Sequence, residues 1–136
     1  MIKVAAGIIM RKERVLLCQR RESARYALKW EFPGGKLERE ELPEECLRRE
    51  LHEELGINAT VGDLFHRQHY QYADSGLYDV FYYLVSYDRG RPVNKAFASF
   101  RWVSLEDLPR YDILEGNKDV VRKIVETYAG AEPRDS

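Results

Sequence analysis

The sequence predicts an α+β domain, in which strands paired as hairpins are combined with two main helices. Short runs of apolar, β-branched and aromatic residues are separated by turn-forming residues, which is typical of hairpins. Two other stretches carry apolar residues at spacings of three and four, as helices packed on a core do. With 136 residues and 44% hydrophobic content, we expect one domain over residues 1–130 and a frayed polar tail at 131–136.

The first part of the chain is expected to form a hairpin. The apolar runs at residues 4–10 and 15–19 are separated by four charged residues, which predicts two strands and a tight turn. Residues 20–25 are polar and aperiodic, which indicates a loop. The sequence Trp30-Glu31-Phe32 leads into a Pro-Gly-Gly sequence at 33–35, which predicts a glycine turn.

The first helix is expected over residues 43–55. Pro43 suits the first helical position, and Gly56 is a natural terminator. Leu42 has no side-chain acceptor to cap the helix, which forfeits about 1 kcal/mol. The helix carries one apolar stripe, formed by Cys46, Leu47, Leu51 and Leu55.

The second half of the chain contains the other strands and the last helix. Residues 59–72 and 77–87 are rich in aromatic and β-branched residues and flank a turn, which predicts a second hairpin. A further strand is expected at 100–103. Residues 104–107 have the spacing of a capped helical turn, and residues 117–128 have helical periodicity.

Charge and cysteine content exclude several classes of protein. The chain has 22 Lys and Arg against 23 Asp and Glu, so its net charge of −1 argues against a polymeric nucleic-acid partner or a membrane surface. No signal-peptide or membrane-span pattern is present in the sequence. Cys18 and Cys46 lack metal-ligand spacing and are expected to be buried thiols. We therefore expect a cytoplasmic protein.

A spaced pattern of glycine, arginine and glutamate between residues 35 and 57 is the most informative feature. At roughly 6% frequency per residue, a chance match of seven strict positions is on the order of 10⁻⁹. The pattern resembles the signature of Nudix hydrolases, G-x5-E-x7-R-E-U-x-E-E-x-G-U with U aliphatic. The resemblance implies an α/β/α sandwich, with a mixed β-sheet between helices, that cleaves diphosphate linkages. The strict positions are Gly35, Glu41, Arg49, Glu50, Glu53, Glu54 and Gly56.

Three glutamates of this pattern are expected to share one helix face. Glu50, Glu53 and Glu54 are related by spacings of three and four, and such like charges repel unless a cation lies among them. Mg²⁺ prefers oxygen ligands of this kind. The alternative is a merely solvated helix face, but it assigns no role to the glycine, to Arg49 or to the fixed spacing.

The family resemblance assigns roles within the pattern. It implies that the backbone carbonyl of Gly35 and the carboxylates of Glu50, Glu53 and Glu54 bind Mg²⁺, with Mn²⁺ as an alternative. Arg49 is implied to pair with a carboxylate and to orient it, because its guanidinium is a rigid bidentate partner. Glu41 is treated as an outer metal ligand.

A general base must accept the proton of the water that attacks phosphorus. Many MutT-type members carry a glutamate in the loop before the strand that ends in Trp, a hydrophobic residue and Ser. Here the loop at residues 94–99 has no carboxylate, and the candidate position near Ala96 is empty. This departure shifts proton transfer to the helix, where we favour Glu53.

The surroundings of the pattern resemble the MutT-like branch. That resemblance implies that Arg21, Phe32 and Asn117 contact a purine nucleotide, since an amide can both donate to and accept from a base edge. Asn117 is equally explained as a helix cap. Arg21 and Lys36 are the candidates for binding phosphates, although basic loop residues are commonly only solvated.

These features predict a nucleoside triphosphate pyrophosphohydrolase that yields a monophosphate and pyrophosphate. The leading candidate substrate is 8-oxo-dGTP, and the corresponding role is nucleotide-pool sanitation. CTP, dinucleoside polyphosphates and the 5′ end of RNA are alternative substrates. A catalytically silent nucleotide sensor is the alternative from another class, but its signature should be degraded, and here it is intact. An mRNA-decapping enzyme needs a more basic surface. A monomer and a homodimer are both compatible with the sequence.

Overall fold

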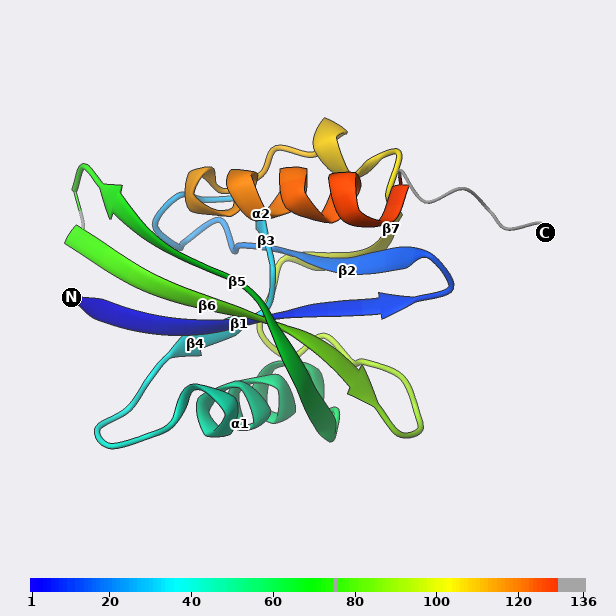
Figure 1. The fold of residues 1–136 in the computed structure, drawn as a ribbon, viewed down its shortest axis with the longest axis horizontal. Coiled ribbons are helices and arrows are strands. Elements are labelled where there is room, and N and C mark those ends of the chain that lie inside the picture. The colour runs from blue at the N-terminus through cyan, green and yellow to red at the C-terminus, as the bar shows by residue number, and fades with distance from the viewer. Residues whose placement is uncertain (75, 130–136) are drawn as a thin grey trace.

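The computed structural model describes residues 1–74 and 76–129 and shows a mixed β-sheet with helices on both faces (Figure 1). Helix α1 (Pro43–Leu55) covers one face, and helix α2 (Lys118–Ile124) covers the other. The expected α+β sandwich is therefore confirmed. The tail predicted at 131–136 lies outside the described residues.

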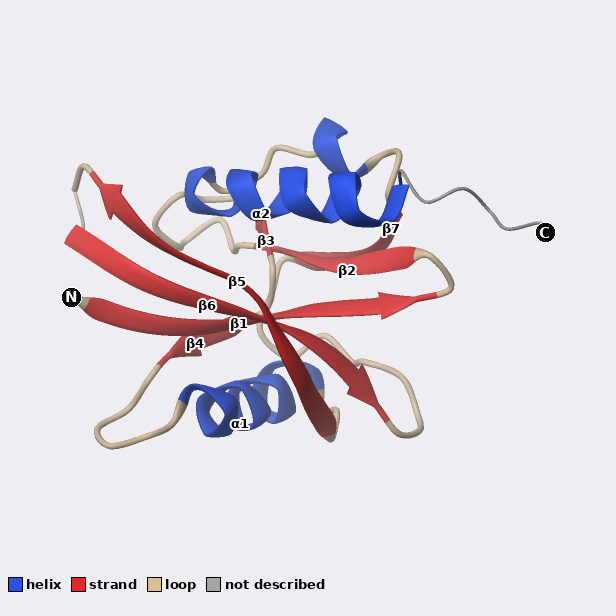
Figure 2. Ribbon diagram, viewed as in Figure 1, coloured by secondary structure: helices blue, strands red, loops and turns tan. Residues whose placement is uncertain are grey.

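The sheet has seven strands within the described part of the chain, in the order β3-β2-β1-β6-β5, with β4 beside β1 and β7 beside β2 (Figure 2). Strand β1 pairs in parallel with β6 and antiparallel with β4 and β2, so the sheet is mixed. The strands are β1 (Ile2–Arg11), β2 (Arg14–Gln19), β3 (Trp30–Glu31), β4 (Gly34–Lys36), β5 (Ala59–Tyr72), β6 (Gly76–Tyr87) and β7 (Ser99–Ser104).

Both predicted hairpins are present. The turn between β1 and β2 places Lys12 and Glu13 at positive φ, 52° and 65°, as a tight two-residue hairpin turn requires. Strands β5 and β6 pair antiparallel from Ala59 opposite Tyr87 to Tyr72 opposite Gly76. The strand pattern on either side therefore predicts the hairpins, since Lys12 and Glu13 are not residues that favour positive φ.

The prediction of a glycine turn at residues 33–35 is wrong for its two glycines. Gly34 and Gly35 belong to β4, where they pair with Ala6 and Ala5 of β1. A Cβ atom on Gly34 would lie 2.0 Å from the carbonyl oxygen of Ala5. The glycine at position 34 thus permits a close approach of two backbones, and the bend itself is at Pro33.

Helix α1 has the predicted bounds. Gly56 adopts a left-handed conformation, φ 68°, and donates its N–H to the carbonyl of His52, as a helix terminator does. Leu42 makes no side-chain cap, as expected, but its backbone N–H donates to Oε1 of Glu45 at 3.0 Å. Glu45 therefore satisfies one of the N–H groups at the start of the helix.

The C-terminal helix is less regular than its periodicity predicts. It begins with a 3₁₀ turn (Glu115–Asn117), continues as α2 and ends in a wider π-helical turn (Val125–Ala129). Before it, the hydroxyl of Ser104 accepts the N–H of Asp107 at 3.2 Å, which confirms the capped turn, and a 3₁₀ turn (Leu108–Arg110) follows.

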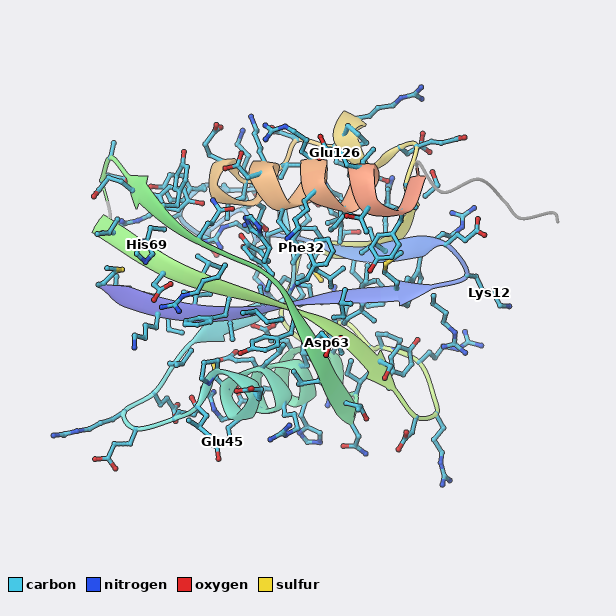
Figure 3. The ribbon with its side chains drawn as sticks, in the orientation of Figure 1. Lys12, Phe32, Glu45, Asp63, His69 and Glu126 are labelled. Carbon is cyan, nitrogen blue, oxygen red and sulfur yellow. The ribbon has the colours of Figure 1, made fainter. Side chains whose placement is uncertain are left out.

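Side chains fill the space on both sides of the sheet (Figure 3). Strand β1 is buried on both faces: Ala5 and Ile9 pack toward α1, and Ala6 and Ile8 pack toward α2. Cys18 and Cys46 are both buried free thiols, as predicted. The two cores fix both helices relative to the strand that carries Gly35. No helix in the described residues is long and apolar enough to cross a bilayer.

Candidate active site

The signature residues extend from β4 through a loop into α1. Gly35 lies on β4 directly against the carboxylate of Glu50: a Cβ atom on Gly35 would lie 2.4 Å from Cδ of Glu50. Any side chain larger than hydrogen would displace this carboxylate from the strand. The first glycine of the pattern therefore brings the helix carboxylate against the strand backbone.

Arg49 connects the loop to the glutamates of the helix. Its Nε and Nη2 atoms bind the two oxygens of Glu41 at 2.8 and 2.9 Å. Its Nη1 lies 3.0 Å from Glu50 and 3.4 Å from Glu53. The expected pairing of Arg49 with a carboxylate is present, and it involves several carboxylates at once.

The carboxylate of Glu41 is fully engaged by protein groups. Besides the two bonds from Arg49, it accepts the backbone N–H of Glu38 at 2.9 Å. The hydrogen bond from Arg49, followed by that from Glu38, lowers the pKa of Glu41 to about 2. Glu41 therefore anchors Arg49. This position is consistent with the expected role of Glu41 as an outer ligand of the metal.

Glu54 is a buried carboxylate that lacks part of its hydrogen bonding. Within residues 1–74 and 76–129, its Oε1 atom is buried and has no hydrogen-bond partner. Burial raises the pKa of Glu54 to about 9, and the carboxylates of Glu50 and Glu31 add to this shift. An unpaired buried carboxylate oxygen is costly unless a cation compensates it.

These residues fit a divalent cation. The donors are all oxygens, from Glu50, Glu53, Glu54 and the backbone at Gly35, which is the chemistry that Mg²⁺ prefers. In the described residues, however, no three acidic, histidine or cysteine side chains are already placed to enclose an ion. Glu53 is the outermost of the three glutamates, with 57% of its side chain exposed.

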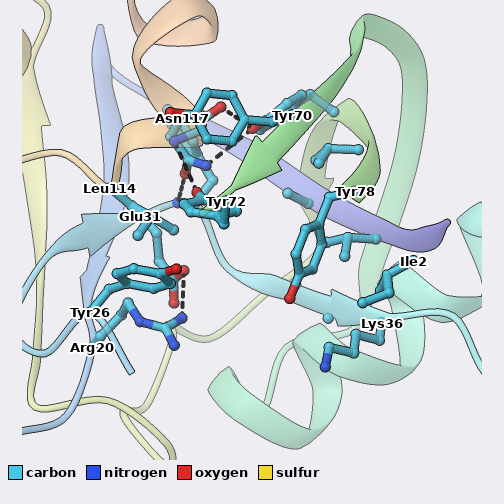
Figure 4. Close-up of a pocket in the computed structure, with 18 of the residues that line it drawn as sticks. Ile2, Arg20, Tyr26, Glu31, Lys36, Tyr70, Tyr72, Tyr78, Leu114 and Asn117 are labelled. Atoms are coloured by element: carbon cyan, nitrogen blue, oxygen red, sulfur yellow. Dashed lines mark hydrogen bonds and ion pairs between the residues drawn. The ribbon is translucent and has the colours of Figure 1, made fainter. Parts of the chain in front are cut away.

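A cavity of about 580 Å³ adjoins the acidic residues (Figure 4). Gly34, Gly35 and Glu54 line it, and so do Leu114, Gly116 and Asn117 from the turn before α2. Its walls are rich in aromatic side chains, contributed by Tyr26, Phe32, Tyr70, Tyr72, Tyr78 and Tyr82. The cavity has a volume typical of small-molecule sites, and its lining combines aromatic walls with charged and polar side chains.

Asn117 lies in this cavity and does not cap the helix that follows. Its side chain makes no capping hydrogen bond, so the cap interpretation is wrong. Instead, Oδ1 accepts the backbone N–H of Phe32 at 3.0 Å, and Nδ2 donates to the hydroxyl of Tyr82 at 3.1 Å. The buried Phe32 ring contacts Tyr82 edge-on, with centroids 6.1 Å apart.

The structure brings three of the four predicted substrate residues to the cavity: Phe32, Lys36 and Asn117. Arg21 lies elsewhere, because its Nε donates to the carbonyl of Ala96 at 2.7 Å in a separate hollow. Its neighbours Arg20 and Arg25 line the cavity instead. The direction of loop side chains depends on what they contact, so the sequence could not distinguish these arginines.

Sequence reasoning missed Glu31 as a member of the cavity wall. Its carboxylate is ion-paired with Arg20 at 3.1 Å. Burial raises the pKa of Glu31, although Arg20 acts in the opposite direction. The sequence feature that could have indicated Glu31 is its position as a charged residue between two aromatic residues, Trp30 and Phe32.

The carboxylate-free loop before β7 packs against the end of α1. The backbone N–H of Lys95 donates to the carbonyl of Glu54 at 3.0 Å. Asn94 organises the loop, since its Oδ1 accepts the N–H groups of Ala96 and Phe97. The loop therefore borders the acidic helix without contributing a carboxylate.

Comparison with known proteins agrees with this geometry. Residues 1–124 match the family profile described as NUDIX domain. The 8-oxo-dGTP diphosphatase of Escherichia coli is 35% identical over 124 residues, which cover 90% of this chain and 95% of that protein. The CTP pyrophosphohydrolase of E. coli is 52% identical over 63 residues, 46% of this chain and 47% of that protein.

Comparison with solved structures supports the fold. The solution structure of the E. coli ORF135 protein has a TM-score of 0.83 and 31% identity, and the match covers 99% of this chain and 95% of that one. The profile spans nearly the whole described chain, and the signature lies across β4 and α1. The chain therefore belongs to the Nudix family and is a Nudix hydrolase.

Proposed function

We propose that this protein is a Mg²⁺-dependent nucleoside triphosphate pyrophosphohydrolase that releases a nucleoside monophosphate and pyrophosphate. One observation carries the proposal: the same aromatic cavity is lined both by Asn117 and by Gly35 and Glu54. A nucleoside in the cavity would thereby extend its phosphates toward the acidic residues.

Nudix hydrolases generally use a divalent metal ion. The orphaned oxygen of Glu54, the carboxylate of Glu50 against Gly35 and the exposed Glu53 are the groups proposed to hold it. A bound divalent ion supplies electrostatic stabilisation of phosphate oxygens and an acidified water. The all-oxygen donor set favours Mg²⁺, with Mn²⁺ as a substitute.

The remaining residues have separate proposed roles. Glu53 accepts a proton from the attacking water, because it is the most solvent-open glutamate of the three and can pass the proton on. Arg49, anchored by Glu41, orients Glu50 and Glu53. Lys36, an exposed residue that lines the cavity, neutralises phosphate charge. As the water oxygen bonds to one phosphorus of the α–β linkage, the bond from that phosphorus to the bridging oxygen breaks, and the monophosphate and pyrophosphate separate.

The nucleotide is proposed to be 8-oxo-dGTP, in keeping with the relative matched along most of both chains. CTP is the second candidate, because the CTP pyrophosphohydrolase of E. coli shares 52% identity over about half of the chain. Phe32 and Asn117 would contact the base in either case, with the ring against its face and the amide at its edge.

A nucleotide panel with Mg²⁺ tests this proposal. Pyrophosphate release is measured for 8-oxo-dGTP, dGTP, CTP and the other nucleoside triphosphates, with orthophosphate measured in parallel. We expect pyrophosphate and a monophosphate in equal amounts, with the highest kcat/KM for 8-oxo-dGTP. Tight nucleotide binding without turnover would instead indicate a sensor.

Glu53→Gln tests the assigned base. We expect a loss of roughly 100-fold or more in kcat, because general-base catalysis typically contributes 10²–10⁴-fold. Glu44→Gln, on the same helix but at a variable position of the signature, is the matched control and should retain activity. Near-normal turnover by Glu53→Gln would remove Glu53 from this role.

A further inference from the structure

The amide of Asn117 is held by two protein groups of opposite hydrogen-bond character. The backbone N–H of Phe32 can only donate, so the atom 3.0 Å from it is the amide oxygen Oδ1. On its other side the amide nitrogen Nδ2 donates to the hydroxyl of Tyr82 at 3.1 Å. The orientation of this amide is therefore determined by its hydrogen bonds.

The hydroxyl of Tyr82 has one proton, and its second contact decides where that proton lies. The carbonyl oxygen of Gly116, 3.2 Å away, can only accept, so Tyr82 donates to it. The lone pairs of Tyr82 then face Asn117, which must present an N–H group. Tyr82 is fully buried, which removes solvent as a competing partner, and burial raises its pKa, so the proton is retained.

A second tyrosine holds the turn that carries Asn117. The hydroxyl of Tyr72 accepts the N–H of Gly116 at 2.9 Å, so both backbone groups of Gly116 are bound by tyrosines of the β5–β6 hairpin. The fit is close, because a Cβ atom on Gly116 would lie 2.5 Å from the Tyr72 oxygen. Figure 4 shows Tyr72 and Asn117 side by side at this end of the cavity.

We infer that Tyr82 is a positioning residue that determines base selectivity through Asn117. With one lone pair and one N–H already used by the protein, Asn117 presents one acceptor and one donor to the cavity in a fixed order. A base edge with the complementary order is bound, whereas the reversed order leaves buried polar groups unpaired. Tyr82 acts by keeping the amide from rotating. The inference rests on the proposed function, since it requires a base in this cavity.

Tyr82→Phe removes the hydroxyl and keeps the ring. The readout is an internal competition, in which one enzyme sample hydrolyses equal concentrations of 8-oxo-dGTP, dGTP, dATP, dCTP and dTTP. The rate ratios equal the ratios of kcat/KM and do not depend on how much of the sample is folded. We expect the preference for the best nucleotide to fall about tenfold, the equivalent of one net hydrogen bond, with kcat for that nucleotide within about threefold of the wild-type value.

Two comparisons separate positioning from general damage. Tyr83→Phe changes the neighbouring buried tyrosine, which faces the α1 side, and should leave the ratios unchanged. In an Asn117→Ala background, Tyr82→Phe should cause no further loss of selectivity, because the two residues act in series. An additional loss of selectivity in the Asn117→Ala background would overturn the inference. It would also be overturned if the Tyr82→Phe protein had the same kcat/KM ratios as the wild type.

Asn117→Asp provides an independent test if Tyr82→Phe does not fold. It keeps the side-chain shape but replaces the donor by an acceptor, so the ranking of the bases must change. An unchanged ranking refutes the positioning role. If the wild-type protein releases pyrophosphate from none of these nucleotides, the proposed function fails, and that result is recognisable without any variant.

Discussion

Replacing Glu54 by glutamine should stabilise the metal-free protein while abolishing its response to Mg²⁺. Burial raises the pKa of Glu54 from 4.5 to about 9, and Oε1 has no hydrogen-bond partner in the described residues. At pH 7 the group is therefore protonated in the folded state and ionised in the unfolded state. A neutral amide of the same shape avoids this change of protonation.

The magnitude follows from linkage. A folded-state pKa above the unfolded value means that folding takes up a proton between pH 4.5 and 9. The stability of the metal-free wild type is then complete below pH 4.5 and falls as pH rises toward 9. At pH 7, about 2.5 units above the unfolded pKa, the cost is about 3 kcal/mol at 1.36 kcal/mol per unit. Glu54→Gln should recover much of this, roughly 5–10 °C in Tm.

Thermal unfolding in the presence of a chelator, and again with excess Mg²⁺, is the measurement. In the chelator, Glu54→Gln should melt above the wild type by a margin that shrinks as the pH is lowered toward 4.5. With Mg²⁺ the wild type should gain stability by mass action, and the variant should gain little. The control Glu44→Gln should behave as the wild type. A Glu54→Gln variant that melts lower in the chelator, or that responds normally to Mg²⁺, would refute the reasoning.

Two further substitutions test the geometry of the signature. Gly35→Ala places a Cβ atom 2.4 Å from Cδ of Glu50, which must move by about 1 Å to reach ordinary contact, so kcat should fall about 100-fold while circular dichroism stays native. Wild-type turnover by Gly35→Ala would show that the contact with Glu50 is not needed. Arg49→Lys keeps the charge but loses the bidentate bond to Glu41, and we expect kcat to fall roughly 10- to 100-fold with a smaller change in KM. Equal kinetics for Arg49→Lys and the wild type would mean that charge alone suffices.

The hairpins, helix α1 and the signature were predictable because their determinants are local. The bounds of α1 follow from Pro43, Gly56 and the apolar stripe between them, which are contiguous in the chain. The last helix was predicted in place but not in detail. Its 3₁₀ start is bound by Tyr72 and Tyr82, residues that are distant in sequence.

The strand at Gly34 and Gly35 and the position of Arg21 were not predictable in the same way. A Pro-Gly-Gly sequence indicates a turn whenever its context is unknown, and only the pairing with β1 makes these glycines part of a strand. Arg21 and Arg20 are neighbours in the same loop, and contacts with Ala96 and Glu31 direct them to different places. Such contacts depend on the folded arrangement of separate segments.

The sequence by itself determined the family. It also determined that the glutamates of α1 share one face of the helix and that its apolar stripe packs on a core, because spacings of three and four residues translate directly into one helix face. Only the tertiary structure decided which groups surround the substrate cavity. Asn117 binds Phe32 across 85 positions of sequence, and this pairing, not helix capping, occupies its amide. Long-range hydrogen bonds of this kind form when β3, β6 and the turn before α2 meet, and no local pattern encodes them.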